Sequence, residues 1–237
     1  MKASILLATY NKEACLPNTL RSIALQKTSF PFEVLVTDDC SLISPQQIVK
    51  TYLPEAKFYR YPHHAGFVFS QGRGMTDMDP NSDIVVIQSC DVMYLSENVL
   101  EELCTSVTPG HFAMAHVRNV DVAGMTLFRS VPLGWHIPGM MHLRDKFLET
   151  KGTNIYSGTQ RPSGDWLLFL GAMRTEDAFR IGFHENCCDV VVQQKIKENG
   201  LKPIFRDDVF AVHQHHPWAH RWPCPVINQC SYWCSRK

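Results

Sequence analysis

The chain has 237 residues, 45% of them hydrophobic, and its 23 Lys and Arg balance its 23 Asp and Glu, which gives a formal net charge of zero. This balance excludes the global positive field by which proteins recruit nucleic acid or acidic lipid. The size suits one α/β domain, which we expect over residues 1–217, followed by a tail rich in Trp, Pro and Cys over residues 218–237.

Three features bear on the compartment. The chain contains no apolar run of the roughly 18 residues that span a bilayer. Its apolar start meets Thr9 after about five residues, which is too short for a signal-peptide core. The nine cysteines are odd in number and scattered, which favours reduced thiols over a disulfide framework. We therefore expect a cytoplasmic protein with no transmembrane segment; peripheral membrane contact and homo-oligomerisation stay open.

The first half of the chain alternates short apolar strands with helices, as is typical of a parallel sheet. Ligands of such sheets bind outside the carboxyl ends of the strands, so the polar residues after each strand are expected to face one crevice. Strands are predicted over residues 4–8, 32–36, 56–61 and 83–88, and helices over 16–24, 45–52, 67–77 and 97–107, the last one capped by Ser96.

The second half is less regular. Residues 112–129 are expected to form one or two strands with a turn at Gly124, and the Gly- and Pro-rich stretch 130–165 is typical of a binding loop or lid. Regular structure is predicted to return at 166–173, with helices over 174–181 and 188–199, a helix stop at Gly200 and a strand over 204–212.

Two segments at the ends of the first two strands carry a resemblance to a known family. Ser4–Lys12 reads Ser-Ile-Leu-Leu-Ala-Thr-Tyr-Asn-Lys and Glu33–Ser41 reads Glu-Val-Leu-Val-Thr-Asp-Asp-Cys-Ser. Together they resemble the opening of family 2 glycosyltransferases with the GT-A fold. Later segments agree in order and spacing, so the resemblance spans residues 3–216; these segments are Asp83–Leu95, Gly171–Arg174, Ile181–Glu185, Asp189 and His213.

The resemblance implies an α/β fold, namely a GT-A (Rossmann-like) three-layer sandwich with a mostly parallel central sheet. It also implies an enzyme of polysaccharide or glycan synthesis. Such an enzyme would be an inverting glycosyltransferase that moves a sugar from a nucleotide-diphosphate donor, with UDP favoured, to a glycan or other hydroxyl acceptor.

The resemblance further implies a donor site at the strand ends. The position of Tyr10 lies against the base and that of Asp39 hydrogen-bonds to it, with Thr9 and Asn11 beside them. Tyr10 could instead fill the core. Two further candidates have ordinary alternatives: Asp38 as a turn residue rather than a nucleotide ligand, and Arg73 as a solvated helix residue rather than a phosphate ligand.

Members of this family hold a divalent cation through an Asp-x-Asp element, and this chain reads Ser89-Cys90-Asp91 there. Asp91 matches the second acid, whereas Ser89 stands at the position of the first. His213 is where some members place a further ligand, although His215 or His216 could take that role. One carboxylate, an imidazole and phosphate oxygens suit Mg²⁺ or Mn²⁺. The replaced acid leaves metal dependence open.

Inverting transfer needs a carboxylate base near the attacking hydroxyl. The resemblance places this base in an acidic pair at a helix start, where this chain reads Cys188-Asp189, so Asp189 is the candidate and Glu185 the reserve. Trp135 and His136 lie in the loop-rich stretch where acceptors bind, and a Trp face there could stack on a sugar or be buried.

Two other functions compete with this interpretation. The replaced first acid favours a non-catalytic relative that binds a nucleotide or glycan. A sugar-phosphate nucleotidyltransferase has a related sheet but begins with a Gly-rich loop, and Ala8–Lys12 contains no Gly. A dinucleotide-dependent dehydrogenase is disfavoured because no Gly-x-Gly-x-x-Gly follows a strand.

Overall fold

The computed structural model describes residues 1–119, 155–157, 170–183 and 189–214. The strands are β1 (Ala3–Thr9), β2 (Phe32–Asp38), β3 (Lys57–Arg60), β4 (Ile84–Ser89), β5 (Val92–Tyr94), β6 (His111–Asn119), β7 (Ile155–Ser157), β8 (Leu170–Arg174) and β9 (Lys202–His213). The helices are α1 (Leu16–Ala24), α2 (Gln46–Tyr52), α3 (Phe67–Asp77), α4 (Val99–Thr105), α7 (Thr175–Arg180) and α8 (Asp189–Glu198).

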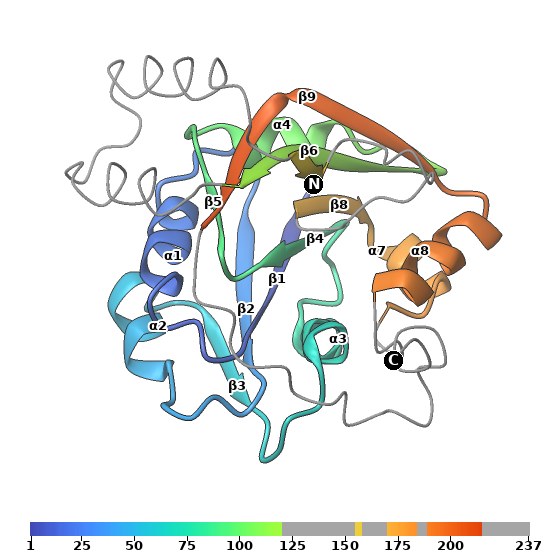
Figure 1. Ribbon diagram of the computed structural model, residues 1–237. Helices are drawn as coiled ribbons and strands as arrows, with labels where there is room; N and C mark the ends of the chain where they lie inside the picture. The colour runs from blue at the N-terminus through green and yellow to red at the C-terminus, as the bar shows by residue number, and fades with distance from the viewer. Residues whose placement is uncertain (120–154, 158–169, 184–188, 215–237) are drawn as a thin grey trace.

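The strands form one sheet in the order β3-β2-β1-β4-β8-β6-β9-β5, with β7 paired to β6 (Figure 1). β1 is parallel to both β2 and β4, and β2 is parallel to β3, whereas β8 joins β4 in the antiparallel direction. The register sets Thr9 opposite Asp38 and Ala8 opposite Ser89. The carboxyl ends of β1, β2 and β4 therefore meet at one edge of the sheet.

Apolar side chains alternate between the two faces of this sheet and are buried on both. Ile5 and Leu7 of β1 pack on the side of α1, α2 and α4, while Leu6 packs on the opposite side. On that side, α3 covers β1 and β2, with α7 and α8 beside it (Figure 1). The result is three layers with a core on each side of the sheet, as the continuous apolar runs predict.

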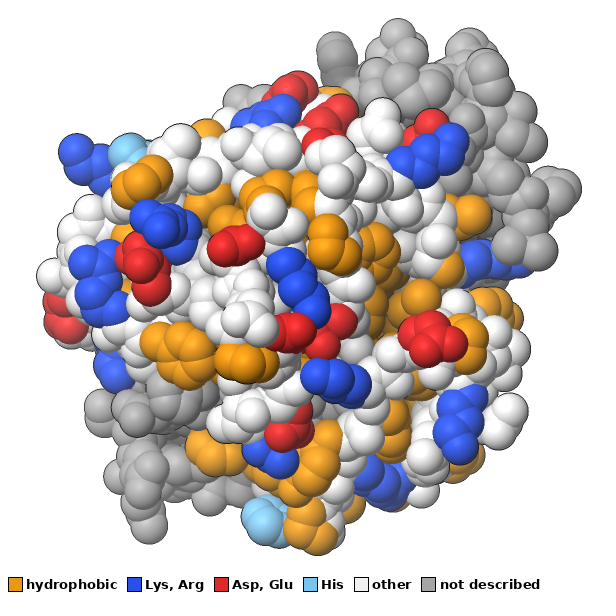
Figure 2. Space-filling view, turned by 180° about the vertical axis from the view of Figure 1, so that it is seen from behind, with side chains coloured by type: hydrophobic (Ala, Val, Ile, Leu, Met, Phe, Trp, Pro, Cys, Tyr) orange, Lys and Arg blue, Asp and Glu red, His pale blue; other side chains and the backbone are white. Residues whose placement is uncertain are grey.

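The surface and the described helices agree with the charge and hydropathy of the sequence. Figure 2 shows the face opposite to that of Figure 1, where acidic and basic side chains are interspersed. Among the described helices, none is both long and apolar enough to cross a membrane. The described cysteines Cys15, Cys40, Cys90 and Cys104 are free thiols.

Most predicted elements are confirmed, one predicted helix cap is wrong, and short strands were missed. The predicted cap of α4 is wrong, because this helix begins at Val99 rather than at 97. A side chain just after α1 provides a hydrogen-bond partner for the first turn of α4 instead. Gln26 Oε1 accepts from the Leu100 N–H at 2.9 Å, and Gln26 Nε2 donates to the Ser96 carbonyl at 2.7 Å. The short strands β5 and β7 were not predicted, and β7 lies within the stretch 130–165 that was expected to be irregular.

A buried hydrogen-bond chain fixes the turn between β4 and β5. Gln88 Nε2 donates to the Val92 carbonyl at 2.9 Å, and the Tyr94 hydroxyl donates to Gln88 Oε1 at 2.5 Å. Gln71 of α3 donates to the Gln88 carbonyl at 2.8 Å. Burial raises the pKa of Tyr94 well above its ordinary value, so this hydroxyl stays a donor. The Ser89-Cys90-Asp91 turn is thereby held at both ends.

Tyr94→Phe is expected to lower the free energy of unfolding by about 1–3 kcal/mol, because Gln88 Oε1 is then buried without its donor. Urea unfolding measures this loss. Tyr52→Phe, at the partly buried end of α2, serves as the control and should cost less. In Gln88→Leu/Tyr94→Phe the loss should be smaller than the sum of the single losses; additive losses would contradict the proposed pairing.

Candidate functional site

The turns after β1 and β2 are joined into one unit. The Asn11 N–H donates to Ser41 Oγ at 2.9 Å, and Asn11 Oδ1 accepts from the Leu42 N–H at 2.8 Å. The Asp39 N–H donates to the Thr9 carbonyl at 2.8 Å. Asn11 has φ 50°, a left-handed conformation that Asn tolerates better than most residues. These bonds hold the predicted residues Thr9, Asn11 and Asp39 together.

Asp38 is fully buried and its carboxylate faces its own turn. Oδ1 accepts from the Ser41 N–H at 3.1 Å and from the Ser41 hydroxyl at 2.5 Å. Arg60 Nη1 lies 3.1 Å from Oδ2 as an ion pair without hydrogen-bond geometry, while the Arg60 side chain donates to the Ser41 carbonyl. These contacts support the turn role for Asp38; its role as a nucleotide ligand stays a prediction.

Asp39 is 1% exposed and connects β2 to the start of α3. Its carboxylate accepts from the N–H groups of Ala65 at 2.6 Å and Gly66 at 2.9 Å, and His64 Nδ1 lies 2.7 Å from Oδ2. The His64 ring also packs on Tyr10, with centroids 4.3 Å apart and planes inclined by 30°. The two residues predicted to hold a base thus contact the same imidazole, which the sequence analysis did not single out.

The Tyr10 phenol is neutral and partly exposed. Burial raises its pKa, against the opposing effect of a hydrogen bond with Asn11. A neutral aromatic ring beside an ionisable carboxylate offers a base a stacking face and a hydrogen-bond acceptor.

A second cluster lies at the end of β4, around Asp91, whose side chain is 6% exposed. Ser89 Oγ donates to Asp91 Oδ1 at 2.6 Å, and His213 Nε2 lies 3.3 Å from the same oxygen. Lys12 Nζ lies 3.3 Å from Oδ2. Antiparallel pairing of β5 with β9 sets Val92 opposite His213 and so brings His213 to Asp91. The structure therefore brings together the two predicted metal ligands.

These groups can contribute two ligands to a cation. Within the described ranges, no group of three or more His, Cys, Asp and Glu side chains is arranged to hold a metal ion. Burial raises the pKa of the Cys90 thiol, so the residue between Ser89 and Asp91 is a neutral thiol rather than a thiolate ligand. Asp91 and His213 fit Mg²⁺ or Mn²⁺ by donor type, with the remaining ligands left to phosphate oxygens and water.

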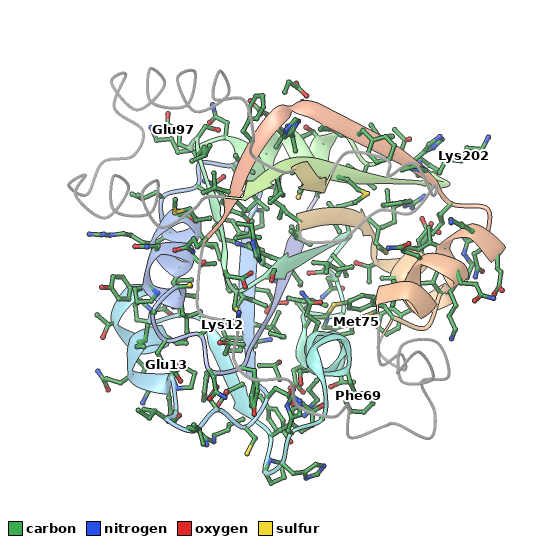
Figure 3. The ribbon with its side chains drawn as sticks, viewed as in Figure 1. Lys12, Glu13, Phe69, Met75, Glu97 and Lys202 are labelled. Atoms are coloured by element: carbon green, nitrogen blue, oxygen red, sulfur yellow. The ribbon has the colours of Figure 1, made fainter. Side chains whose placement is uncertain are left out.

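Lys12 is the residue of this cluster that sequence reasoning missed. Lys12 is the last residue of the segment Ser4–Lys12. Its side chain is long and flexible, so the sequence does not predict where the ammonium group lies. Figure 3 shows Lys12 in the loop after β1, between α1 and α3. Its carbonyl accepts from the Cys15 and Leu16 N–H groups at 3.0 and 2.9 Å, which fixes the backbone from which the side chain reaches Asp91.

Of the remaining predicted residues, Arg73 is described in full and has partners outside these two clusters. The Arg73 guanidinium lies 3.2 Å from Asp77, donates to Thr76 and stacks 4.6 Å from the centre of the Tyr59 ring. Asp189 is the first residue of α8, which agrees with its expected place at a helix start. Glu185, Trp135, His136, His215 and His216 lie outside the described residues, as does the tail 218–237, so their roles stay predictions.

Comparison with known proteins gives a family and a relative. The family model described as Glycosyl transferase family 2 matches residues 4–163. Hyaluronan synthase of Pasteurella multocida is 34% identical over 90 residues, which are 38% of this chain and 9% of that protein. The chain thus spans a small part of this curated relative.

Solved structures resemble the whole described fold. S. aureus TarS in complex with UDP-GlcNAc has a TM-score of 0.61 at 18% identity, over 93% of this chain and 60% of that chain. The mannosyltransferase PcManGT from Pyrobaculum calidifontis, with GDP-Man and Mn²⁺, gives 0.57 at 18%, over 89% and 56%. GalNAc-T7 with UDP, GalNAc and Mn²⁺ gives 0.58 at 14%, over 92% and 44%. At such identities the likeness concerns the fold, and the predicted GT-A architecture is confirmed.

Ser41→Ala is expected to lower the free energy of unfolding by about 1–3 kcal/mol, because Ser41 is 1% exposed and bridges Asn11 and Asp38. The matched control is Ser44→Ala at an exposed position of the same loop, where the hydroxyl accepts a long bond of 3.4 Å from the Gln46 N–H; it should cost less than Ser41→Ala. Urea unfolding compares the two variants. Equal small effects would show that the β1 and β2 turns are not held by this hydroxyl.

Proposed function

Because the chain belongs to glycosyl transferase family 2, we propose that it transfers a sugar from a nucleotide-diphosphate donor to a hydroxyl of a glycan or other acceptor. One observation carries the proposal: Tyr10, Asp39 and Asp91 follow three neighbouring parallel strands at one edge of the sheet, and His213 comes within 3.3 Å of Asp91. The aromatic face of Tyr10 can stack on a base, and Asp39 can accept a hydrogen bond from an N–H of that base. The pair Asp91 and His213 can hold a cation beside the diphosphate.

The base is proposed to lie against Tyr10 and to donate an N–H to Asp39. The N–H groups of Ala65 and Gly66 donate to the Asp39 carboxylate, so its oxygens already act as hydrogen-bond acceptors at this edge. Uracil and guanine offer an N–H at the matching position, and UDP is the favoured donor nucleotide. The structures of TarS and GalNAc-T7 contain UDP-GlcNAc and UDP, and that of PcManGT contains GDP-Man, which supports this class of donor.

Asp91 and His213 are proposed to hold Mg²⁺ or Mn²⁺ together with the donor phosphates. When bound, the ion supplies positive charge to the departing diphosphate. The Ser89 hydroxyl orients Asp91 through Oδ1 and adds no charge. The Mn²⁺ named for PcManGT and GalNAc-T7 supports a divalent ion in this fold.

Asp189 is proposed to take the proton of the acceptor hydroxyl. Its place at the N-terminus of α8 favours the ionised carboxylate that a general base needs. Attack on the anomeric carbon from the side opposite the diphosphate then inverts the configuration in a single displacement. Glu185 as the reserve base, acceptor binding by Trp135 and His136, and a cytoplasmic location remain part of the proposal.

A non-catalytic nucleotide- or glycan-binding protein is the second candidate, and Ser89 in place of the first acid favours it. Incubation with several UDP- and GDP-sugars and Mn²⁺, followed by detection of released nucleotide diphosphate, separates the candidates. Release supports the transferase, whereas donor binding without release supports the second candidate.

UDP with Mn²⁺ is expected to raise the melting temperature, because a ligand at 100 times its Kd stabilises the native state by about 2.7 kcal/mol. Asp91→Asn should remove the part of the shift that depends on Mn²⁺ and leave a part that EDTA does not abolish. Asp208→Asn, on an exposed side chain of β9, is the matched control and should keep the full shift. An Mn²⁺-dependent shift unchanged in Asp91→Asn would refute its assignment as a ligand.

Asp189→Asn should lower kcat by about 10²–10⁴-fold because the base is lost, while the thermal shift by UDP and Mn²⁺ stays as in the wild type. Initial rates of UDP release at saturating donor measure the effect. Wild-type rates in this variant would remove Asp189 from the mechanism and leave Glu185 as the candidate, to be tested by Glu185→Gln.

A further inference from the structure

The ion pair between Lys12 and Asp91 is largely shielded from water. The two side chains are only 17% and 6% exposed, and Nζ lies 3.3 Å from Oδ2. Removing an ammonium and a carboxylate from water is costly, and their mutual attraction offsets that cost only while both remain in place. Ser89 and His213 approach Oδ1, the other oxygen of the carboxylate. Lys12 therefore occupies the Oδ2 side of Asp91.

This arrangement creates a competition at Asp91. An ammonium and a divalent cation carry charges of the same sign and cannot both lie against one carboxylate oxygen without strong repulsion. His213 and Asp91 are the described side chains that suit the cation, so Lys12 weakens the metal site as long as it stays on Oδ2. A lysine stem is flexible and its ammonium has three donors, so it can exchange one anionic partner for another.

Among the described carboxylates at this edge, Asp38 and Asp39 already have donors of their own. Asp38 is engaged with Ser41 and Arg60, and Asp39 with His64 and the N–H groups at the start of α3. An incoming diphosphate would bring new anionic oxygens to the edge where Lys12 lies.

We propose that Lys12 is an internal counter-cation that leaves Asp91 for the donor diphosphate, so that nucleotide binding opens the metal site. This inference rests on the proposed function, because it assumes a nucleotide diphosphate at this edge. Lys12 then contributes a charge-assisted hydrogen bond to a phosphate oxygen, and Asp91 becomes available to the cation. By linkage, UDP must raise the affinity for Mn²⁺ by the same factor by which Mn²⁺ raises the affinity for UDP.

The test compares wild type, Lys12→Met and Lys12→Arg by titration with two probes, UDP in EDTA and Mn²⁺ alone. Lys12→Met should weaken UDP binding in EDTA by about 10- to 100-fold, because a charge-assisted hydrogen bond is lost. The same variant should bind Mn²⁺ alone more tightly than the wild type does, because the competing ammonium is gone. Lys12→Arg should keep most of the UDP affinity.

The opposite signs of these two effects separate the proposal from a loss of structure, which would weaken both ligands together. The matched control is Lys27→Met, which removes a 71% exposed lysine paired with Glu97 and should change neither affinity. UDP affinity in EDTA within twofold of the wild type, or weaker Mn²⁺ binding in Lys12→Met, overturns the proposal for Lys12. A wild-type protein that binds no nucleotide diphosphate overturns the proposed function together with it.

Discussion

The parallel register of β1 with β2 and β4 is the constraint on which the candidate site depends. It sets Thr9 beside Asp38 and Ala8 beside Ser89, so three turns that are far apart in the sequence lie next to one another. The apolar residues of these strands are buried on both faces. A slip by one residue would move each side chain to the opposite face, into a space that is close-packed around a different side chain. The position of the polar residues thus follows from the packing of the core.

The carboxylates at this edge differ in the kind of partner that holds them. Asp39 is bound by two backbone N–H groups, which are fixed by the start of α3, and Asp38 is enclosed by its own turn and Arg60. Asp91 is paired with the end of a flexible lysine chain. A buried carboxylate needs such donors, because leaving it without them is costly. At this edge, the donors that bind Asp39 are fixed in the backbone, whereas the lysine that pairs with Asp91 can move to another anionic partner.

The sequence predicted most strands and helices. It also predicted the family resemblance, which the match over residues 4–163 confirms. It succeeded where a short apolar run or a helical period is itself the signal, as in β1 and α1. It failed where a contact between distant residues determines the start of a helix. At α4, the first turn is hydrogen-bonded to Gln26, which lies far away in the sequence. In the site, the strand-end rule predicted that Tyr10, Asn11 and Asp39 lie at one edge, and the family resemblance pointed to Asp91. His64 and Lys12 were missed, because the position of the His64 ring depends on a loop conformation and that of the Lys12 ammonium on a flexible side chain.

The central claim is that a nucleotide diphosphate binds at the carboxyl ends of β1, β2 and β4. A crystal structure of the protein with UDP and Mn²⁺ tests it most directly. The account predicts the base against Tyr10 and Asp39, with the diphosphate beside Lys12 and Asp91. Well-defined UDP bound elsewhere on the protein, with Tyr10 and Asp39 out of contact with it, would contradict the account.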